Sequence, residues 1–311
     1  MIVRPRPSLF ALLFVLRGTI LPRVLPHALV IASLSAVVVW LFNHGFRPVR
    51  APSAAPLSLL GIALSVFLGF RNSACFERWW EARKQWGALI IDLRSLSREA
   101  IAQLDDGAEA VPHVGRAAAR RLVHRNIAFA HALAGHLRGH DATADVSRFL
   151  EEAERVRVLA SVNPPDALLR EHARELAGLR RTGALSDITW SALSGRVLGL
   201  AAVLGACERI RFTPLPFAYT VLLHRTAYLF CLLLPLGLAD ALGWFTPLLA
   251  AAVTYTFFGL DVLGDELEEP FGAAPNDLPL LAMARTIEIN LLEALGEPVP
   301  EPLLPVDFVL S

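Results

Sequence analysis

The sequence predicts an all-α membrane protein with a large aqueous part, and both composition and patterning support this class. Hydrophobic residues make up 54% of the 311 residues and charged residues 19%, whereas soluble domains average roughly 45–50% and about 25%. In the charged stretches, apolar residues recur at intervals of three and four, which is the period of amphipathic helices. No stretch shows the alternation of a half-buried strand. The net charge is zero, so the charge balance does not indicate a nucleic-acid partner.

Four apolar segments are expected to form the membrane helices. The first is long enough to cross a hydrocarbon core of about 30 Å. The third and fourth are separated by only a few residues around Asp240, which predicts an antiparallel hairpin. Ahead of them, residues 6–18 are expected to form an amphipathic helix at the membrane surface. The four segments are residues 24–42, 56–70, 214–239 and 241–264.

The charged region between the second and third segments is expected to form a series of amphipathic helices, interrupted at Asn163-Pro164-Pro165. Arginines are frequent there and also precede the first segment, which places both parts in the cytoplasm. Four spans then return both termini to the cytoplasmic side. The expected organisation is a surface helix, first span and short second helix at 1–70, cytoplasmic helices at 71–213, the third and fourth spans at 214–264, and a cytoplasmic tail at 265–311.

The second segment is short for a membrane helix. As a helix it would measure about 22 Å, which is less than the hydrocarbon thickness. Ile62, Val66 and Phe70 fall four residues apart and share one face. One interpretation is an ordinary membrane helix whose stripe packs against its neighbours, and spacing alone favours it. The other is a pore wall, in which a symmetric oligomer stacks these residues into apolar rings that gate by dewetting.

Several motifs resemble the bestrophin family, in particular its bacterial branch. The second segment and its continuation carry SLLGIALSVFLGFRN and ERWWEAR. Three further stretches follow in the order found in the family: CERIRFTPLPFAY at 207–219, LHRTAYLF at 223–230 and EPFGAAPNDLPL at 269–280. These motifs are distributed between residues 58 and 280 of the chain, although residues 101–185 match less distinctly.

The resemblance implies a homopentameric ion channel in a bacterial inner membrane. Its partners would be copies of itself, membrane lipid and the small monovalent ions that pass through one axial pore. Ile62, Val66 and Phe70 match the three apolar positions of the family's membrane neck. Ile188, by its distance before the TPLP motif, matches the apolar residue of the cytoplasmic aperture.

The resemblance also implies which ions pass through the channel and whether calcium activates it. Eukaryotic members are calcium-activated anion channels, whereas bacterial members similar to this chain are regarded as sodium-conducting and calcium-independent. In eukaryotic members an acidic run after a Pro-Phe-Gly motif clasps calcium, an ion that takes about six to eight oxygen ligands. Here four residues without a carboxylate separate Gly272 from Asp277. We therefore expect a calcium-independent cation channel and keep an anion channel as the alternative, because apolar rings carry no sign of charge.

Five acidic residues cluster where the fourth segment ends. In a pentamer they are a candidate acidic belt that would concentrate cations by focusing the electric field. The alternative interpretation is salt bridging to nearby arginines such as Arg71. The five residues are Asp261, Asp265, Glu266, Glu268 and Glu269.

Two alternatives come from other classes of protein. His136 and His140 lie four residues apart in a histidine-rich helical region and could bind zinc, as in a membrane-bound metalloenzyme. A structural assembly with a sealed axis is the third interpretation. The sequence carries no nucleotide loop, nucleophile triad or paired catalytic carboxylates that rise above chance. We therefore expect no enzyme activity, no catalytic residue, no cofactor and no metal.

Overall fold

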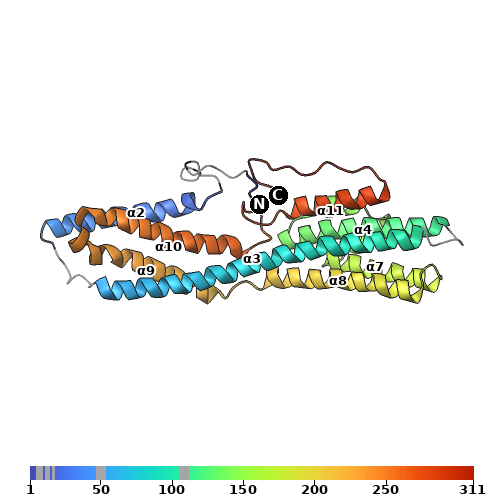
Figure 1. Cartoon of the computed structure of the whole chain (residues 1–311), viewed down its shortest axis with the longest axis horizontal. Helices are drawn as coiled ribbons and strands as arrows, with labels where there is room; N and C mark the ends of the chain where they lie inside the picture. The colour runs from blue at the N-terminus through green and yellow to red at the C-terminus, as the bar shows by residue number, and fades with distance from the viewer. Residues whose placement is uncertain (5–9, 11–14, 16–17, 47–53, 106–111) are drawn as a thin grey trace. The chain divides into compact units, whose positions relative to one another are not determined.

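The computed structural model describes all residues except 5–9, 11–14, 16–17, 47–53 and 106–111, so the expected surface helix over 6–18 lies almost entirely outside the described residues. Within the described ranges the secondary structure is helical, with isolated bridges and no strand. The chain divides into two compact units (Figure 1). We call Arg4–Trp79 with Pro214–Pro270 the apolar unit, and Met1–Val3 with Trp80–Thr213 and Phe271–Ser311 the polar unit.

The apolar unit is built from four helical segments. Helix α2 packs against α9 and α10, and these two pack against each other. A three-residue 3-10 turn joins α9 to α10, and Gly243 in this turn has a φ of +49°. This confirms the short hairpin connection, although Asp240 belongs to α9 itself. The segments are α2 (Leu21–Asn43), α3 (Ala54–Asp105) as far as Trp79, α9 (Phe217–Leu242), η1 (Gly243–Phe245) and α10 (Thr246–Glu268).

A core of aliphatic and aromatic side chains holds the apolar unit together. Leu64 and Leu68 of α3 are buried in the same cluster as Phe230 of α9 and Phe258 of α10. Gly61 allows the close approach of α3 to α9, because a Cβ atom there would lie 3.0 Å from the ring of Phe230. In lipid, helices associate through close van der Waals packing of this kind and not through removal of apolar surface from water, so this cluster holds the four segments together by contact.

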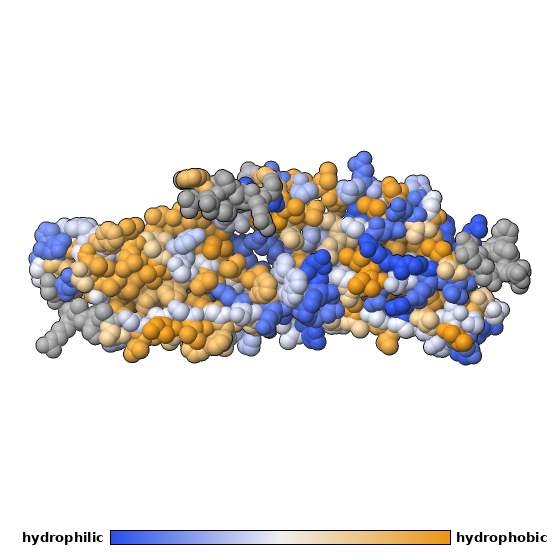
Figure 2. Space-filling model, viewed as in Figure 1, coloured by the Kyte–Doolittle hydropathy of each residue, from blue (hydrophilic) through white to orange (hydrophobic). Residues whose placement is uncertain are grey.

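The outer surface of the apolar unit is itself apolar. Figure 2 shows hydrophobic side chains over the helices of this unit, while hydrophilic side chains gather on the polar unit. Large exposed apolar surfaces mark membrane or protein contacts. Four described stretches are long and apolar enough to cross a membrane: α2, α3 over Ala55–Leu104, α8 (Asp187–Phe212), and α9 with α10 over Phe217–Glu268. The sequence predicts α8 as a cytoplasmic helix, and α8 lies in the polar unit, packed against α4 and α7.

In the polar unit, α4 contacts α5, α7, α8 and α11. The Asn-Pro-Pro stretch that interrupts the predicted helices marks the start of α7: the side chain of Asn163 accepts a hydrogen bond from the backbone N–H of Asp166, and Pro164 occupies the first turn. The remaining helices are α4 (Pro112–Arg138), α5 (Thr143–Ser147), α6 (Glu152–Leu159), α7 (Pro164–Arg181) and α11 (Leu280–Leu295).

The two ends of the chain meet in the polar unit. The Met1 amino group donates to the backbone oxygen of Leu310, and the Val3 N–H donates to Phe308 at 2.8 Å. Ile2 and Val309 form an antiparallel bridge. These contacts hold the two ends side by side within the polar unit (Figure 1).

Candidate functional site

One face of α3 in the apolar unit is packed and the opposite face is open. Leu64 and Leu68 are 1% and 0% exposed, whereas Ile62, Val66 and Phe70 are 62%, 48% and 64% exposed. At about 100° per residue, these three side chains point almost directly away from the packed face. The stripe therefore makes no contacts that bury it within the unit, and it remains available to lipid, to another subunit or to a pore.

The open face extends beyond the three residues predicted from the sequence. Leu59 is 70% exposed on the same line, and Ser73 and Glu77 continue it at spacings of three and four. Glu77 forms no hydrogen bond or ion pair with any residue that the structure describes. The same periodicity, carried one turn toward the start of the helix and two turns toward its end, identifies these residues from the sequence.

Ile188 lies in the first turn of α8 and is 84% exposed. The side chain of Ser186 caps this helix by accepting the Thr189 N–H at 3.1 Å. Arg180 donates from Nε to Asp187 at 2.7 Å, and its guanidinium lies 4.5 Å from the ring centroid of Trp190. Arg180 thus contacts the residues on both sides of Ile188 and holds the start of α8 in place.

The acidic cluster on α10 is largely paired with basic groups of its own unit. Asp261 is buried, 2.9 Å from Nη1 of Arg71 and 2.6 Å from Nδ1 of His224. Arg71 also bonds Asp265, and its Nη2 lies 3.5 Å from Glu268. These three acidic residues therefore form salt bridges with Arg71, as the alternative interpretation of the acidic cluster expects.

The remaining acidic residues differ from one another. Glu266 pairs with Arg23 at 3.2 Å. Glu269 is exposed and has no hydrogen-bond or ion-pair partner among the described residues. The Asp265 side chain also remains 56% exposed despite its bond to Arg71. Solvent-facing carboxylate in this cluster is therefore concentrated on Asp265 and Glu269.

Two of the residues weighed as cation ligands, Asp277 and His136, bond to neighbouring side chains or backbone. Asp277 is buried and accepts the Ala274 N–H at 2.6 Å, which closes the turn after the Pro-Phe-Gly motif. Nε2 of His136 lies 3.1 Å from Glu208, which also accepts from Asn163 at 2.7 Å. Within the described ranges, no group of three or more His, Cys, Asp or Glu side chains is arranged to hold a metal ion.

A unit of membrane-length helices with an open apolar stripe on one of them defines a helical membrane protein. Comparison with known proteins narrows the class further. A family model described as "Bacterial/Fungal Bestrophin protein" matches residues 1–293. The chain belongs to the bestrophin family.

Full-length relatives and a solved structure agree with this assignment. The chain is 43% identical to the voltage-dependent anion channel-forming protein mll4386 of Mesorhizobium japonicum, over 100% of this chain and 97% of that protein. It is 41% identical to the voltage-dependent anion channel-forming protein YneE of Escherichia coli, over 98% of each. The crystal structure of a bacterial bestrophin homolog from Klebsiella pneumoniae matches with a TM-score of 0.82 and 42% identity, over 88% of this chain and 99% of the other.

Proposed function

We propose that this protein is a passive ion channel that assembles as a homopentamer in a bacterial inner membrane, with both termini in the cytoplasm. The observation that carries the proposal is the open Ile62–Val66–Phe70 face of α3. Five copies of this face around one axis form three stacked apolar rings, a constriction that can gate by dewetting. The names of the relatives as channel-forming proteins support a channel over an enzyme.

The other parts of the chain have roles that follow from this arrangement. The exposed apolar surfaces of α2, α9 and α10 contact lipid. The apolar part of α3 can be shorter than a membrane span because its open face lines the axis and does not face lipid. Ile188, exposed in the first turn of α8, forms a second apolar ring at the cytoplasmic aperture. The side-by-side termini agree with their placement on one side of the membrane.

Monovalent cations are the permeant ions in this proposal, and Glu77 supplies a physical reason. It lies two turns beyond Phe70 on the same open face and has no basic partner among the described residues. Five copies would form a ring of carboxylates next to the neck, where a low-dielectric wall focuses the field and concentrates cations. Asp265 and Glu269 add solvent-facing carboxylate to the acidic belt. Calcium is not required in this proposal, because the four residues that follow the Pro-Phe-Gly motif carry no carboxylate.

The second candidate is an anion channel of the same architecture, which the names of the relatives as anion channel-forming proteins favour. Purified protein in planar bilayers with a tenfold sodium chloride gradient separates the two. The current of an ideally selective channel reverses about 59 mV from zero, and the sign of this potential identifies the ion. A cation-selective channel is expected to give a reversal potential with the sign of the sodium equilibrium potential. Calcium chelation should leave this reversal potential unchanged. Absence of current in every salt would contradict the channel, and stoichiometric zinc by elemental analysis would favour the metalloenzyme.

A further inference from the structure

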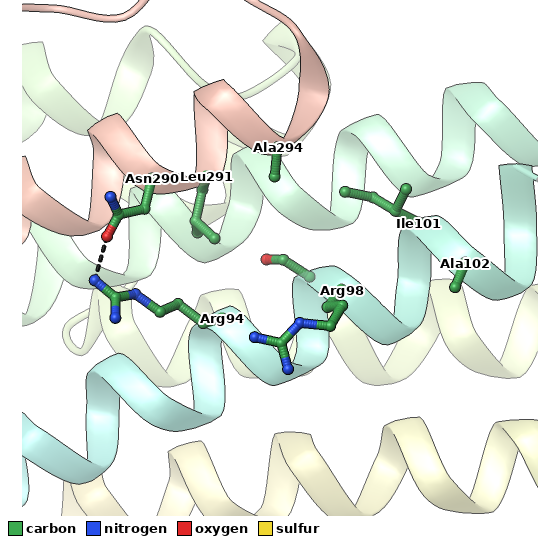
Figure 3. Close-up of a pocket in the computed structure, with 8 residues that line it drawn as sticks. Arg94, Arg98, Ile101, Ala102, Asn290, Leu291 and Ala294 are labelled. Atoms are coloured by element: carbon green, nitrogen blue, oxygen red, sulfur yellow. Dashed lines mark hydrogen bonds between the residues drawn. The ribbon is translucent and has the colours of Figure 1, made fainter.

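A pocket of about 400 Å³ opens between α3 and α11 in the polar unit. Helix α3 lines it with Arg94, Arg98, Ile101 and Ala102, and α11 lines it with Asn290, Leu291 and Ala294 (Figure 3). Ser97 of α3 also belongs to the lining. Neither the open stripe of α3 nor Ile188 nor the acidic cluster contributes to its wall. The pocket is therefore separate from the residues proposed to line the pore.

The charge of the pocket is one-sided. Its lining includes two arginines and no carboxylate. Arg94 donates to the side-chain oxygen of Asn290, which is a neutral partner (Figure 3). Arg98 forms no hydrogen bond or ion pair with any residue in the part of the chain that the structure describes. Guanidinium groups present planar forks of N–H donors that match carboxylate and phosphate oxygens, so the pocket is suited to an anion.

Buried and apolar side chains complete the lining of the pocket. Ser97 is fully buried, and its Oγ accepts a hydrogen bond from the Asn126 side chain at 2.9 Å. Because Ser97 has no exposed surface, it supports the wall of the pocket from within and does not face a ligand. The buried side chain of Leu291 and the methyl group of Ala294 form an apolar wall beside the two arginines. Few convergent polar groups next to an apolar wall are typical of small-molecule sites, as is a volume of roughly 300–1,000 Å³.

We propose that this pocket binds a small organic anion. Its charged head, a carboxylate or a phosphate, is held by Arg94 and Arg98. Its short hydrocarbon part packs against Leu291 and Ala294. Because the pocket is separate from the stripe, binding does not depend on the ion selectivity proposed above.

Calorimetric titration of the full-length protein in nanodiscs tests the proposal with hexanoate as the probe, and with acetate, inorganic phosphate and 1-hexanol for comparison. Hexanoate is expected to bind saturably. Each buried methylene contributes about fourfold in affinity, so acetate and inorganic phosphate should bind at least tenfold more weakly. The uncharged 1-hexanol should show only unsaturable partitioning into lipid. Absence of saturable hexanoate binding would overturn the proposal, as would equal binding of 1-hexanol or of phosphate.

Variants locate the binding in the pocket. Arg98→Gln should weaken hexanoate binding at least tenfold, and Arg98→Lys, which keeps the charge but not the fork, should weaken it less. Ala294→Leu should fill the apolar side and abolish binding while leaving both arginines in place. Arg170→Gln, which changes an exposed arginine outside the pocket, is the matched control. Unchanged binding in both Arg98→Gln and Ala294→Leu would refute the site, provided that their thermal unfolding matches the parent.

Discussion

Nη1 of Arg71 on α3 lies 2.9 Å from Oδ1 of Asp261 on α10, and the two side chains are 0% and 4% exposed. The same guanidinium bonds Asp265 and lies near Glu268. One arginine on the packed side of α3 therefore pairs with several carboxylates of α10. Because Ile62, Val66 and Phe70 lie on the opposite side of that helix, this ion pair helps to set the direction in which the open stripe faces.

Removal of this arginine should be strongly destabilising. Arg71→Met leaves the buried carboxylate of Asp261 without its guanidinium, and breaking a buried ion pair in this way costs roughly 3–5 kcal/mol. We expect a large fall in the thermal unfolding temperature of the detergent-solubilised protein, with loss of assembled protein on size exclusion. Arg225→Met is the control, since Arg225 is exposed in the same unit and has no partner among the described residues. Equal melting of the two variants would contradict a structural role for the pair.

Gly264 should not tolerate a side chain. A Cβ atom there would lie 2.7 Å from Oδ1 of Asn72 and 2.9 Å from Nη1 of Arg71. Gly264→Ala is therefore expected to push these groups apart and lower the free energy of unfolding by about 1–3 kcal/mol. Gly69→Ala is the matched change on α3, because its Cβ would meet no atom within 4 Å. A denaturation series on both variants checks the difference, and a Gly264→Ala protein as stable as Gly69→Ala would show that the contact relaxes freely.

Glu77 should influence the ratio of cation to anion current. Glu77→Gln removes the carboxylate but keeps the side-chain size, so a ring of five negative charges is lost next to the neck. We expect the reversal potential in asymmetric sodium chloride to move toward zero by several millivolts or more, with the effect largest at low ionic strength. Glu301→Gln, an exposed carboxylate on the C-terminal tail, should leave it unchanged. Identical reversal potentials for parent and Glu77→Gln would remove Glu77 from the selectivity proposal.

Arg180 should affect the aperture indirectly, because it holds the start of α8, where Ile188 lies. Ile188→Ala is expected to change conductance or selectivity because it widens an apolar ring. Arg180→Gln removes both the contact with Asp187 and that with Trp190, so the start of α8 becomes less restrained and single-channel current should become more variable. Arg180→Lys, which keeps the charge, should restore part of the parental behaviour. If Arg180→Gln channels matched the parent while Ile188→Ala channels did not, the contacts of Arg180 with Asp187 and Trp190 would have no effect on the aperture.

The polar unit should lose stability in acid. A hydrogen bond from Arg157 lowers the pKa of Glu171 below its ordinary 4.5, and the charges of Arg157 and Arg174 add to this effect. A carboxylate whose pKa is lower in the folded state stabilises the protein above its unfolded pKa, and this contribution disappears as the pH falls through the folded value. The unfolding temperature should therefore drop below about pH 4.5. Glu171→Gln should melt lower at pH 7 and show a flatter decline in acid, and a parallel decline would contradict this assignment.

The spacing of apolar residues predicted the helical elements well, because residues three and four apart in the sequence lie on the same face of a helix. The apolar segments correspond to α2, the first part of α3, α9 and α10, and the short link between the last two is confirmed. The family assignment is also confirmed, because the family model matches residues 1–293. The neck residues, the aperture residue and the acidic belt remain predictions about an assembly of several copies.

The sequence by itself determined the order of the helices, the family and the line of side chains along α3, since all of these follow from local spacing and motif order. The tertiary structure alone decided which acidic residues are neutralised and where the anion pocket lies. Arg71 and Asp261 are 190 positions apart, and the pocket joins α3 to α11. Such contacts depend on how distant helices pack, and a one-dimensional pattern of apolar and charged residues carries no information on which partner a buried charge will meet.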